Sequence, residues 1–188
     1  MKSDLVIGMA GSGGDGVVSA GEALTAAAAA AGYHVIMTKS FGSQIRGGES
    51  SCRVRVSSRP IFGCGGTLDV AVALSWPDFL KFGGELPVGP DTVVLYDAGS
   101  GVEPKDVPLA GISPARILRA PIAEMSVQGV GNERARNVVV LGLLAGWLVI
   151  VTLIGVTTRV RYPRGEWLIA DDDDFALRVG TSMRATRW

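Results

Sequence analysis

A glycine-rich loop near the N-terminus, Gly11 to Gly16, has the spacing of a phosphate-binding loop. Glycines at positions 11, 13 and 16 follow an apolar run at 4–10 and precede an alanine-rich segment at 17–31, which is the strand–loop–helix setting of the dinucleotide-binding fingerprint. Backbone without side chains lets N–H groups approach a phosphate, and the N-terminus of a helix adds a positive dipole. A tight turn that packs a helix on a strand has the same spacing, so both interpretations stay open.

Residues near this loop limit the ligand that it could take. Nicotinamide enzymes with this pattern have an acid at the end of the second strand, whereas this chain has Lys39 there. A lysine favours an additional phosphate, as on NADP or coenzyme A. Asp15 lies inside the loop, where its carboxylate would oppose a phosphate unless it points away. No Gly-x-x-x-x-Gly-Lys-Ser/Thr pattern occurs, which excludes an ATP-cleaving P-loop.

A second polar, glycine-rich loop at 39–50 contains Arg46 between turn residues. The planar guanidinium group suits a carboxylate or a phosphate. An ion pair with Glu49 that only shapes the loop is an equally good interpretation.

Composition excludes several classes of protein. The chain has 188 residues, of which 47% are hydrophobic and 19% charged, and this suits one α/β domain with a substantial core. Lys and Arg balance Asp and Glu at 18 each, so there is no global basic field to hold nucleic acid. Two cysteines cannot supply the four thiolates of an iron–sulfur cluster, and with one histidine a structural zinc site is not expected. We expect two reduced, buried thiols.

The elements that position these loops follow from the hydrophobic pattern. Helices are expected at 17–31, from Trp76 onward and at 133–148. Strands are expected at 4–10, 33–38, 51–57, 68–74 (central), 91–97 and 116–123 (at an edge, because Pro121 removes a ladder donor). The sequence therefore predicts an α/β fold: a mostly parallel sheet of about six strands with helices on its faces and a Rossmann-like strand–glycine loop–helix start. The first two strands should run parallel through a right-handed crossover.

Three segments, in this order, resemble the gamma subunit of pyruvate and ketoisovalerate:ferredoxin oxidoreductases. They are Gly-Ser-Gly-Gly-Asp-Gly-Val-Val at 11–18, the Arg-Gly-Gly loop at 46–48 before an alternating strand, and Gly-Asn-Glu-Arg-Ala-Arg-Asn at 131–137 followed by Leu-Gly at 141–142. Asp15 resembles the form in which the gamma domain is fused to the alpha chain, as in 2-oxoglutarate oxidoreductases. The resemblance implies a gamma-type domain at 1–148 and a divergent tail at 149–188.

The resemblance also implies a function that depends on partners. The complex would convert a 2-oxoacid and coenzyme A to an acyl-CoA and CO₂ while reducing ferredoxin, with thiamine diphosphate, Mg and iron–sulfur clusters on alpha, beta and delta-type subunits. The gamma component would pack on the alpha module, help bind coenzyme A, hold no cofactor tightly and not be catalytic alone. By carry-over, the cofactor-binding set comprises Gly11, Gly13, Gly14, Gly16, Lys39 and Arg46.

Three other interpretations stay open. One is a free-standing oxidoreductase that binds NADP through the glycine loop, and another is a purely structural interaction module. The third is a membrane-tethered form, because Val138 to Thr158 contains no charged residue and is long enough to span a bilayer. Since 133–148 already matches a core helix, we expect a cytoplasmic protein.

Overall fold

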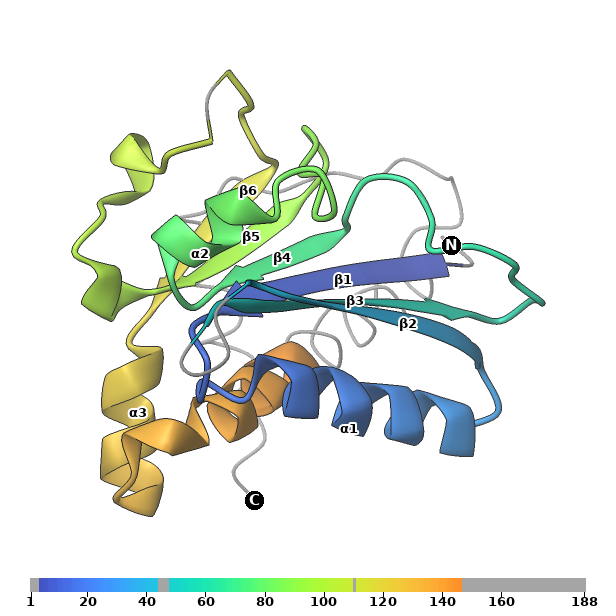
Figure 1. Ribbon diagram of the computed structural model, residues 1–188, viewed down its shortest axis with the longest axis horizontal. Coiled ribbons are helices and arrows are strands. Elements are labelled where there is room, and N and C mark those ends of the chain that lie inside the picture. The colour runs from blue at the N-terminus through green and yellow to red at the C-terminus, as the bar shows by residue number, and fades with distance from the viewer. Residues whose placement is uncertain (1–3, 44–47, 110, 147–188) are drawn as a thin grey trace, which may run out of the picture. The chain divides into compact units, whose positions relative to one another are not determined.

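The computed structural model describes residues 4–43, 48–109 and 111–146, which form a six-stranded mixed sheet with helices on its faces (Figure 1). The strand order is β2-β3-β1-β4-β5-β6. The strands are β1 (Asp4–Gly11), β2 (His34–Phe41), β3 (Ser50–Ser57), β4 (Val70–Ala73), β5 (Val93–Asp97) and β6 (Arg116–Ala120). β3 is antiparallel to both of its neighbours, and the other pairs are parallel. The predicted fold class is therefore confirmed.

The helices lie on both faces of the sheet. α1 (Val17–Ala30) lies on one face and α2 (Trp76–Lys81) on the other (Figure 1). α3 (Ile122–Val130) follows β6, and residues 136–146 form a further helical run. Single 3-10 turns are η1 (Ala98–Ser100), η2 (Pro104–Asp106) and η3 (Glu133–Ala135). The helix predicted at 133–148 thus begins as a 3-10 turn, and its last two residues lie outside the described ranges.

One hydrophobic core cluster lies between the sheet and α2. Trp76 and Phe79 of α2 are buried, and the Trp76 ring contacts both Phe79 and Tyr96 of β5. On the opposite face, α1 approaches the sheet at Gly21, where a Cβ atom would lie 2.7 Å from Cys52 Sγ. This close packing buries the start of α1 and holds it against β1 and β3, which fixes the position of the glycine loop.

β1 and β2 run in the same direction, as predicted, but they are not neighbours. β3 lies between them and pairs with β1 from Asp4↔Ser57 to Gly11↔Ser50, and with β2 from His34↔Ser57 to Phe41↔Ser50. The chain after β2 therefore turns back as an antiparallel hairpin and inserts β3 beside β1. The Rossmann-like start is confirmed, whereas the second strand is displaced by one position from its place in a dinucleotide-binding unit.

The strand expected at 116–123 needs correction. The strand expected at 116–123 ends at Ala120, and Pro121 instead precedes α3 and accepts a hydrogen bond from Met125 N at 2.8 Å. A proline suits the start of a helix because its missing N–H has no intrahelical partner there. β6 does lie at the sheet edge, and β4 is central, as predicted.

The two cysteines differ in environment. Both are free thiols; Cys52 is buried and Cys64 is only half-buried, so the expectation of two buried thiols was wrong for Cys64. Burial raises the pKa of the Cys52 thiol to about 12, and its Sγ lies 3.4 Å from the carbonyl oxygen of Val17. Cys52 therefore acts as a neutral packing residue.

Within the described ranges, no helix is long and apolar enough to cross a bilayer. The candidate span at 138–158 lies largely outside those ranges, because residues from 147 onward are not described.

Candidate functional site

The glycine loop joins the end of β1 to the start of α1 and requires glycine at two positions. Gly14 has φ +106° and Gly16 has φ +74°, values that residues with a side chain rarely adopt. Gly16 is the N-cap residue of α1, and no side chain caps that helix. The amide groups of the first turn are thus without the side-chain oxygen that normally satisfies one of them.

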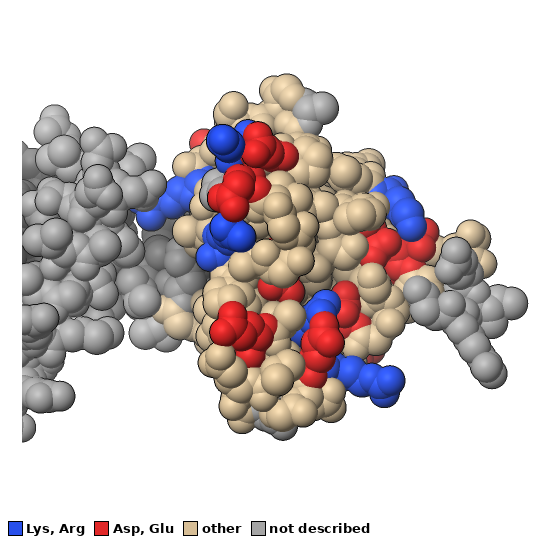
Figure 2. Space-filling model, turned by 90° about the vertical axis from the view of Figure 1, so that its left-hand side faces the viewer, with Lys and Arg blue, Asp and Glu red and all other residues tan. Residues whose placement is uncertain are grey.

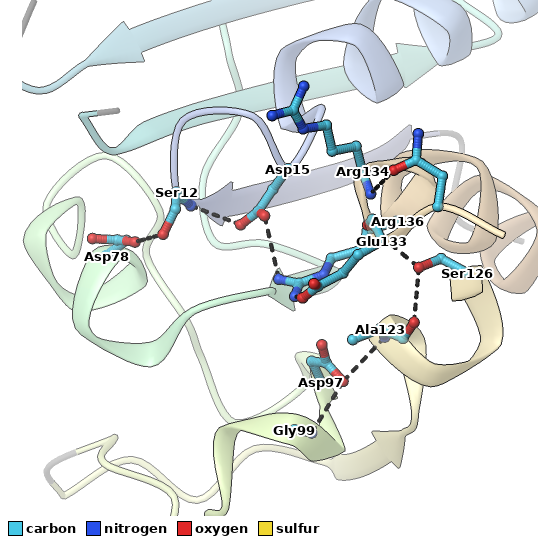
Figure 3. A network of polar contacts seen from close by, with 11 residues as sticks. Ser12, Asp15, Asp78, Asp97, Gly99, Ala123, Ser126, Glu133, Arg134 and Arg136 are labelled. Atoms are coloured by element: carbon cyan, nitrogen blue, oxygen red, sulfur yellow. Dashed lines mark hydrogen bonds and ion pairs between the residues drawn. The ribbon is translucent and has the colours of Figure 1, made fainter. Parts of the chain in front are cut away.

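Asp15 does not oppose an anion at this loop, because its carboxylate is directed elsewhere (Figure 3). Ser12 N donates to Asp15 Oδ2 at 2.8 Å, and Arg136 Nη1 lies 3.2 Å from Oδ1. The Asp15 side chain is 14% exposed and that of Arg136 18%. The acid within this loop is therefore a structural group, paired with a cation and bonded to the loop backbone.

The segment at 131–137 packs directly on the same loop. A Cβ atom on Gly16 would lie 2.7 Å from Cγ of Asn137, so this glycine is needed for close approach as well as for its φ. With the Arg136–Asp15 ion pair, this contact joins the third segment of the family resemblance to the first. Sequence reasoning gave neither Arg136 nor Asn137 a role; the one available signal was the unpaired acid at Asp15.

The second loop is tied to the first through α2. Glu49 Oε2 lies 3.2 Å from Lys81 Nζ, and Lys81 lies 3.3 Å from Asp78 Oδ1. Asp78 in turn accepts a 2.6 Å hydrogen bond from Ser12 Oγ (Figure 3). At the base of the second loop, Gly42 N donates to Glu49 O at 2.8 Å. One lysine thus links both loops through two carboxylates.

The ionisation of these groups fits that network. A hydrogen bond from its own backbone and another from Lys81 lower the pKa of Glu49. Burial alone would raise the pKa of Asp78, but hydrogen bonds from Ser12, Ser75 and Lys81 outweigh it and lower that pKa. The pKa of Lys81 is raised by its hydrogen bonds to Glu49 and Asp78. The network therefore remains charged over the physiological range.

A groove of about 450 Å³ lies between the two loops. It opens at the carboxyl ends of β1 and β2, the edge where α/β sheets bind ligands. Half of its lining residues are glycines, so few side chains occupy its wall. The lining residues are Gly13, Gly14, Gly16, Val18 and Ser19 from the first loop and α1, and Phe41, Gly42, Gly48, Glu49 and Ser50 from the second loop and its flanking strands.

The predicted site residues are distributed unevenly around this groove. Gly13, Gly14 and Gly16 line it. Gly11 is the last residue of β1, and a Cβ atom there would lie 2.8 Å from Asp15 Oδ2, which makes it a packing position of the loop. Lys39 forms an ion pair with Glu22 of α1 and is not among the lining residues. Arg46 lies outside the described residues; the binding roles of all six stay predictions.

Charges are mixed on the side of the molecule shown in Figure 2, where acidic and basic side chains of the described residues alternate over the surface. Such a surface exerts little long-range attraction on an anion. Anion binding in the groove would therefore depend on local backbone N–H groups and the dipole of α1.

The fold and the groove define a class: a mixed α/β module with a glycine-rich loop suited to an anionic ligand. The chain belongs to the pyruvate ferredoxin/flavodoxin oxidoreductase family, whose model matches residues 6–161. The family predicted from the three sequence segments is thereby confirmed.

Two relatives of established name are similar in sequence. The 2-oxoglutarate synthase subunit KorC of Methanothermobacter marburgensis is 33% identical over 146 residues, which cover 73% of this chain and 74% of KorC. The ketoisovalerate oxidoreductase subunit VorA of the same organism is 34% identical over 137 residues, which cover 72% of this chain but 27% of VorA.

Two solved structures are similar in fold and sequence. One is the 2-oxoglutarate:ferredoxin oxidoreductase of Magnetococcus marinus with 2-oxoglutarate, coenzyme A and succinyl-CoA bound; its TM-score is 0.64 and its identity 31%, over 77% of this chain and 24% of that one. The other is the gamma subunit of a keto/oxoacid ferredoxin oxidoreductase from Geobacter sulfurreducens, with a TM-score of 0.56 and 26% identity over 74% and 75% of the two chains. This chain thus spans about a quarter of some relatives and three quarters of others.

Proposed function

We propose that this chain is the gamma-type component of a 2-oxoacid:ferredoxin oxidoreductase and that its groove holds part of coenzyme A. One observation carries the proposal: described residues from each of the three segments of the family resemblance form the glycine loop, line the groove beside it or pack on that loop. The glycine loop and the second loop form its walls, and the segment at 131–137 supports the glycine loop through Arg136 and Asn137. The similar Magnetococcus enzyme has coenzyme A bound.

The chemistry of the groove suits the phosphates of coenzyme A. Five of the residues that line the groove are glycines, and the first turn of α1 has no side-chain cap. Backbone N–H groups there are the donors that we propose for the phosphates, and a helix N-terminus favours negative charge. The acids within the two loops each have a cationic partner: Asp15 pairs with Arg136, and Glu49 pairs with Lys81, which also contacts Asp78. The chain's own residues would therefore bind and orient the anionic end of the ligand.

The redox step would take place on partner subunits. Two cysteines in the whole chain cannot hold a four-thiolate cluster, and no cluster of three or more His, Cys, Asp or Glu side chains occurs within the described ranges. In the proposal, thiamine diphosphate, Mg and iron–sulfur clusters belong to alpha, beta and delta-type subunits, and those clusters pass electrons to ferredoxin. A cytoplasmic location is part of the proposal and stays a prediction.

The alternatives have less support. No relative reported above is named as a nicotinamide-dependent enzyme. Lys39, the residue that favoured NADP, pairs with Glu22 on the surface of α1. A purely structural module would still explain the fold, so it is the alternative that the experiment has to exclude.

Replacing Gly14 by alanine tests the proposal, with Gly32→Ala as a matched control. Gly14 and Gly32 have φ +106° and +84°, and an added Cβ atom would meet no atom within 4 Å at either position. Both changes therefore introduce similar backbone strain, about 1–2 kcal/mol, but only Gly14 lines the groove.

In the assembled complex, we expect Gly14→Ala to raise the KM for coenzyme A about 3- to 30-fold, equivalent to about 0.7–2 kcal/mol, and Gly32→Ala to leave it unchanged. Steady-state rates at varied coenzyme A, with melting temperatures of both variants, provide the measurement. Equal KM values for the two variants would favour the purely structural role.

A further inference from the structure

Phe41 is an exposed aromatic side chain on the wall of the groove. It is the last residue of β2, it is 67% exposed, and it lines the same groove as Gly13, Gly14 and Gly16. Nothing in the phosphate-binding role of the glycine loop requires an aromatic ring here. Single exposed apolar side chains are common on protein surfaces, so the inference rests on the position of Phe41 at the groove and not on its exposure.

The backbone around Phe41 is held in place on both sides. Phe41 is paired with Ser50 of β3, and the next residue, Gly42, donates its N–H to Glu49 O at 2.8 Å. A Cβ atom on Gly42 would clash with the Glu49 side chain, and that side chain is anchored by Lys81. The ring is therefore presented from a fixed strand end, which lowers the entropy cost of ordering it on binding.

Strand alternation places Phe41 on the α1 side of the sheet. Side chains two residues apart share a face, so Met37, Lys39 and Phe41 lie in one row. Met37 packs against α1 at Gly21, and Lys39 pairs with Glu22 of α1. Phe41 continues this row toward the strand end, where Val18 and Ser19 of the first helical turn line the groove with it.

The spacing between Phe41 and the glycine loop matches a nucleotide. Phe41 pairs with Ser50, and Ser50 pairs with Gly11, so the three residues form one row across three strands. Adjacent strands are about 4.8 Å apart, which puts the Phe41 backbone about 10 Å from Gly11. Adenine is separated from a pyrophosphate by one ribose, a comparable span.

We propose that Phe41 stacks on the adenine ring of coenzyme A while the glycine loop binds its phosphates. This inference rests on the proposed function and adds a residue that selects for the nucleotide half of the ligand. Aromatic side chains bind bases face to face because every base offers a π surface. The exposed ring and the side-chain-free loop then form two ends of one adenine-nucleotide site.

The test compares ligand truncation with side-chain truncation in the assembled oxidoreductase. The variants are Phe41→Ala, Phe41→Trp and the control Phe62→Ala, and the probes are coenzyme A and 4′-phosphopantetheine, which has no adenosine. Phe62 is a suitable control because it is 97% exposed and is not among the residues that line the groove.

We expect Phe41→Ala to raise the KM for coenzyme A about 5- to 100-fold, with the KM for 4′-phosphopantetheine and kcat unchanged. Phe41→Trp keeps an aromatic ring and should leave the KM for coenzyme A near the wild-type value. Phe62→Ala should change the KM for neither coenzyme A nor 4′-phosphopantetheine. An equal effect of Phe41→Ala on both probes, or no effect on either, would overturn the stacking role. Since Gly14→Ala tests the groove separately, a failure here is distinguishable from a failure of the proposed function.

Discussion

At the scale of single residues, the ion pair of Asp15 with Arg136 connects the glycine loop to the segment at 131–137. Each side chain is less than a fifth exposed, 14% and 18% respectively, so neither charge is fully hydrated. Ser12 N also donates to Asp15, which connects the ion pair to the loop backbone. Because desolvation offsets the attraction, the pair itself adds little net stability, but removal of one partner should cost more than it does for an ion pair in solvent.

Replacing Arg136 by glutamine should lower the free energy of unfolding by about 1–3 kcal/mol, because Asp15 would keep a partly buried charge without its cation. Arg119→Gln is the control: Arg119 and Glu103 are closer, at 2.9 Å, but 38% and 54% exposed, and the expected loss is below about 1 kcal/mol. Urea denaturation of the three proteins measures both values. Equal losses would show that burial of the Asp15–Arg136 pair contributes nothing.

Residue-level prediction from the sequence succeeded where the contact is local. Gly13, Gly14 and Gly16 could be assigned to one loop because their spacing lies between a strand and a helix, and they do line one groove. Arg136 could not be assigned, because its partner Asp15 is 121 residues away in sequence and no local pattern encodes that pairing. Phe41 was likewise part of a named loop without a role, since exposure is a property of the folded chain.

At the scale of elements, the first turn of α1 is where helix stability and ligand binding can be separated. Ser19 is the third residue of α1, is exposed, and lines the groove. A glutamate at this position stabilises a helix through the dipole, by about 0.3–1 kcal/mol. The same charge lies where we propose an anionic ligand, and there it is repulsive.

Ser19→Glu should therefore raise the KM for coenzyme A about tenfold, which corresponds to about 1.4 kcal/mol, while the melting temperature stays equal or rises. The control Ser19→Gln introduces a side chain with nearly the shape of glutamate but without its charge, and it should leave the KM for coenzyme A within about twofold of the wild-type value. Rates at varied coenzyme A and thermal melts of the assembled complex provide the data. An unchanged KM in Ser19→Glu would place the anion elsewhere.

Element types were predictable from hydrophobic period, whereas strand order was not. The runs at 4–10, 51–57 and 68–74 all became strands, close to their predicted bounds. The insertion of β3 between β1 and β2 depends on antiparallel pairing along its whole length with both neighbours. No local sequence pattern encodes the pairing of β3 with β1, because the two strands are far apart in the chain. α3 was missed because Pro121 was read as an interruption of a strand, although it precedes a helix.

At the scale of the whole molecule, the described residues form a groove beside the glycine loop but contain no cluster of three or more His, Cys, Asp or Glu side chains. It matches 74% of KorC and 27% of VorA, so the same module occurs in chains of very different length. A module of this kind suits an assembly in which the remaining chemistry is supplied by other domains or subunits. The predicted tail at 149–188 lies outside the described residues and stays a prediction.

The most direct test is purification of the tagged full-length chain from its native cells, followed by an assay of 2-oxoacid oxidation with ferredoxin as electron acceptor. We predict that thiamine diphosphate-containing subunits co-purify, that activity depends on coenzyme A, and that the chain separated from its partners is inactive. Catalysis by the separated chain, or the absence of any thiamine diphosphate-containing partner, would contradict the central claim.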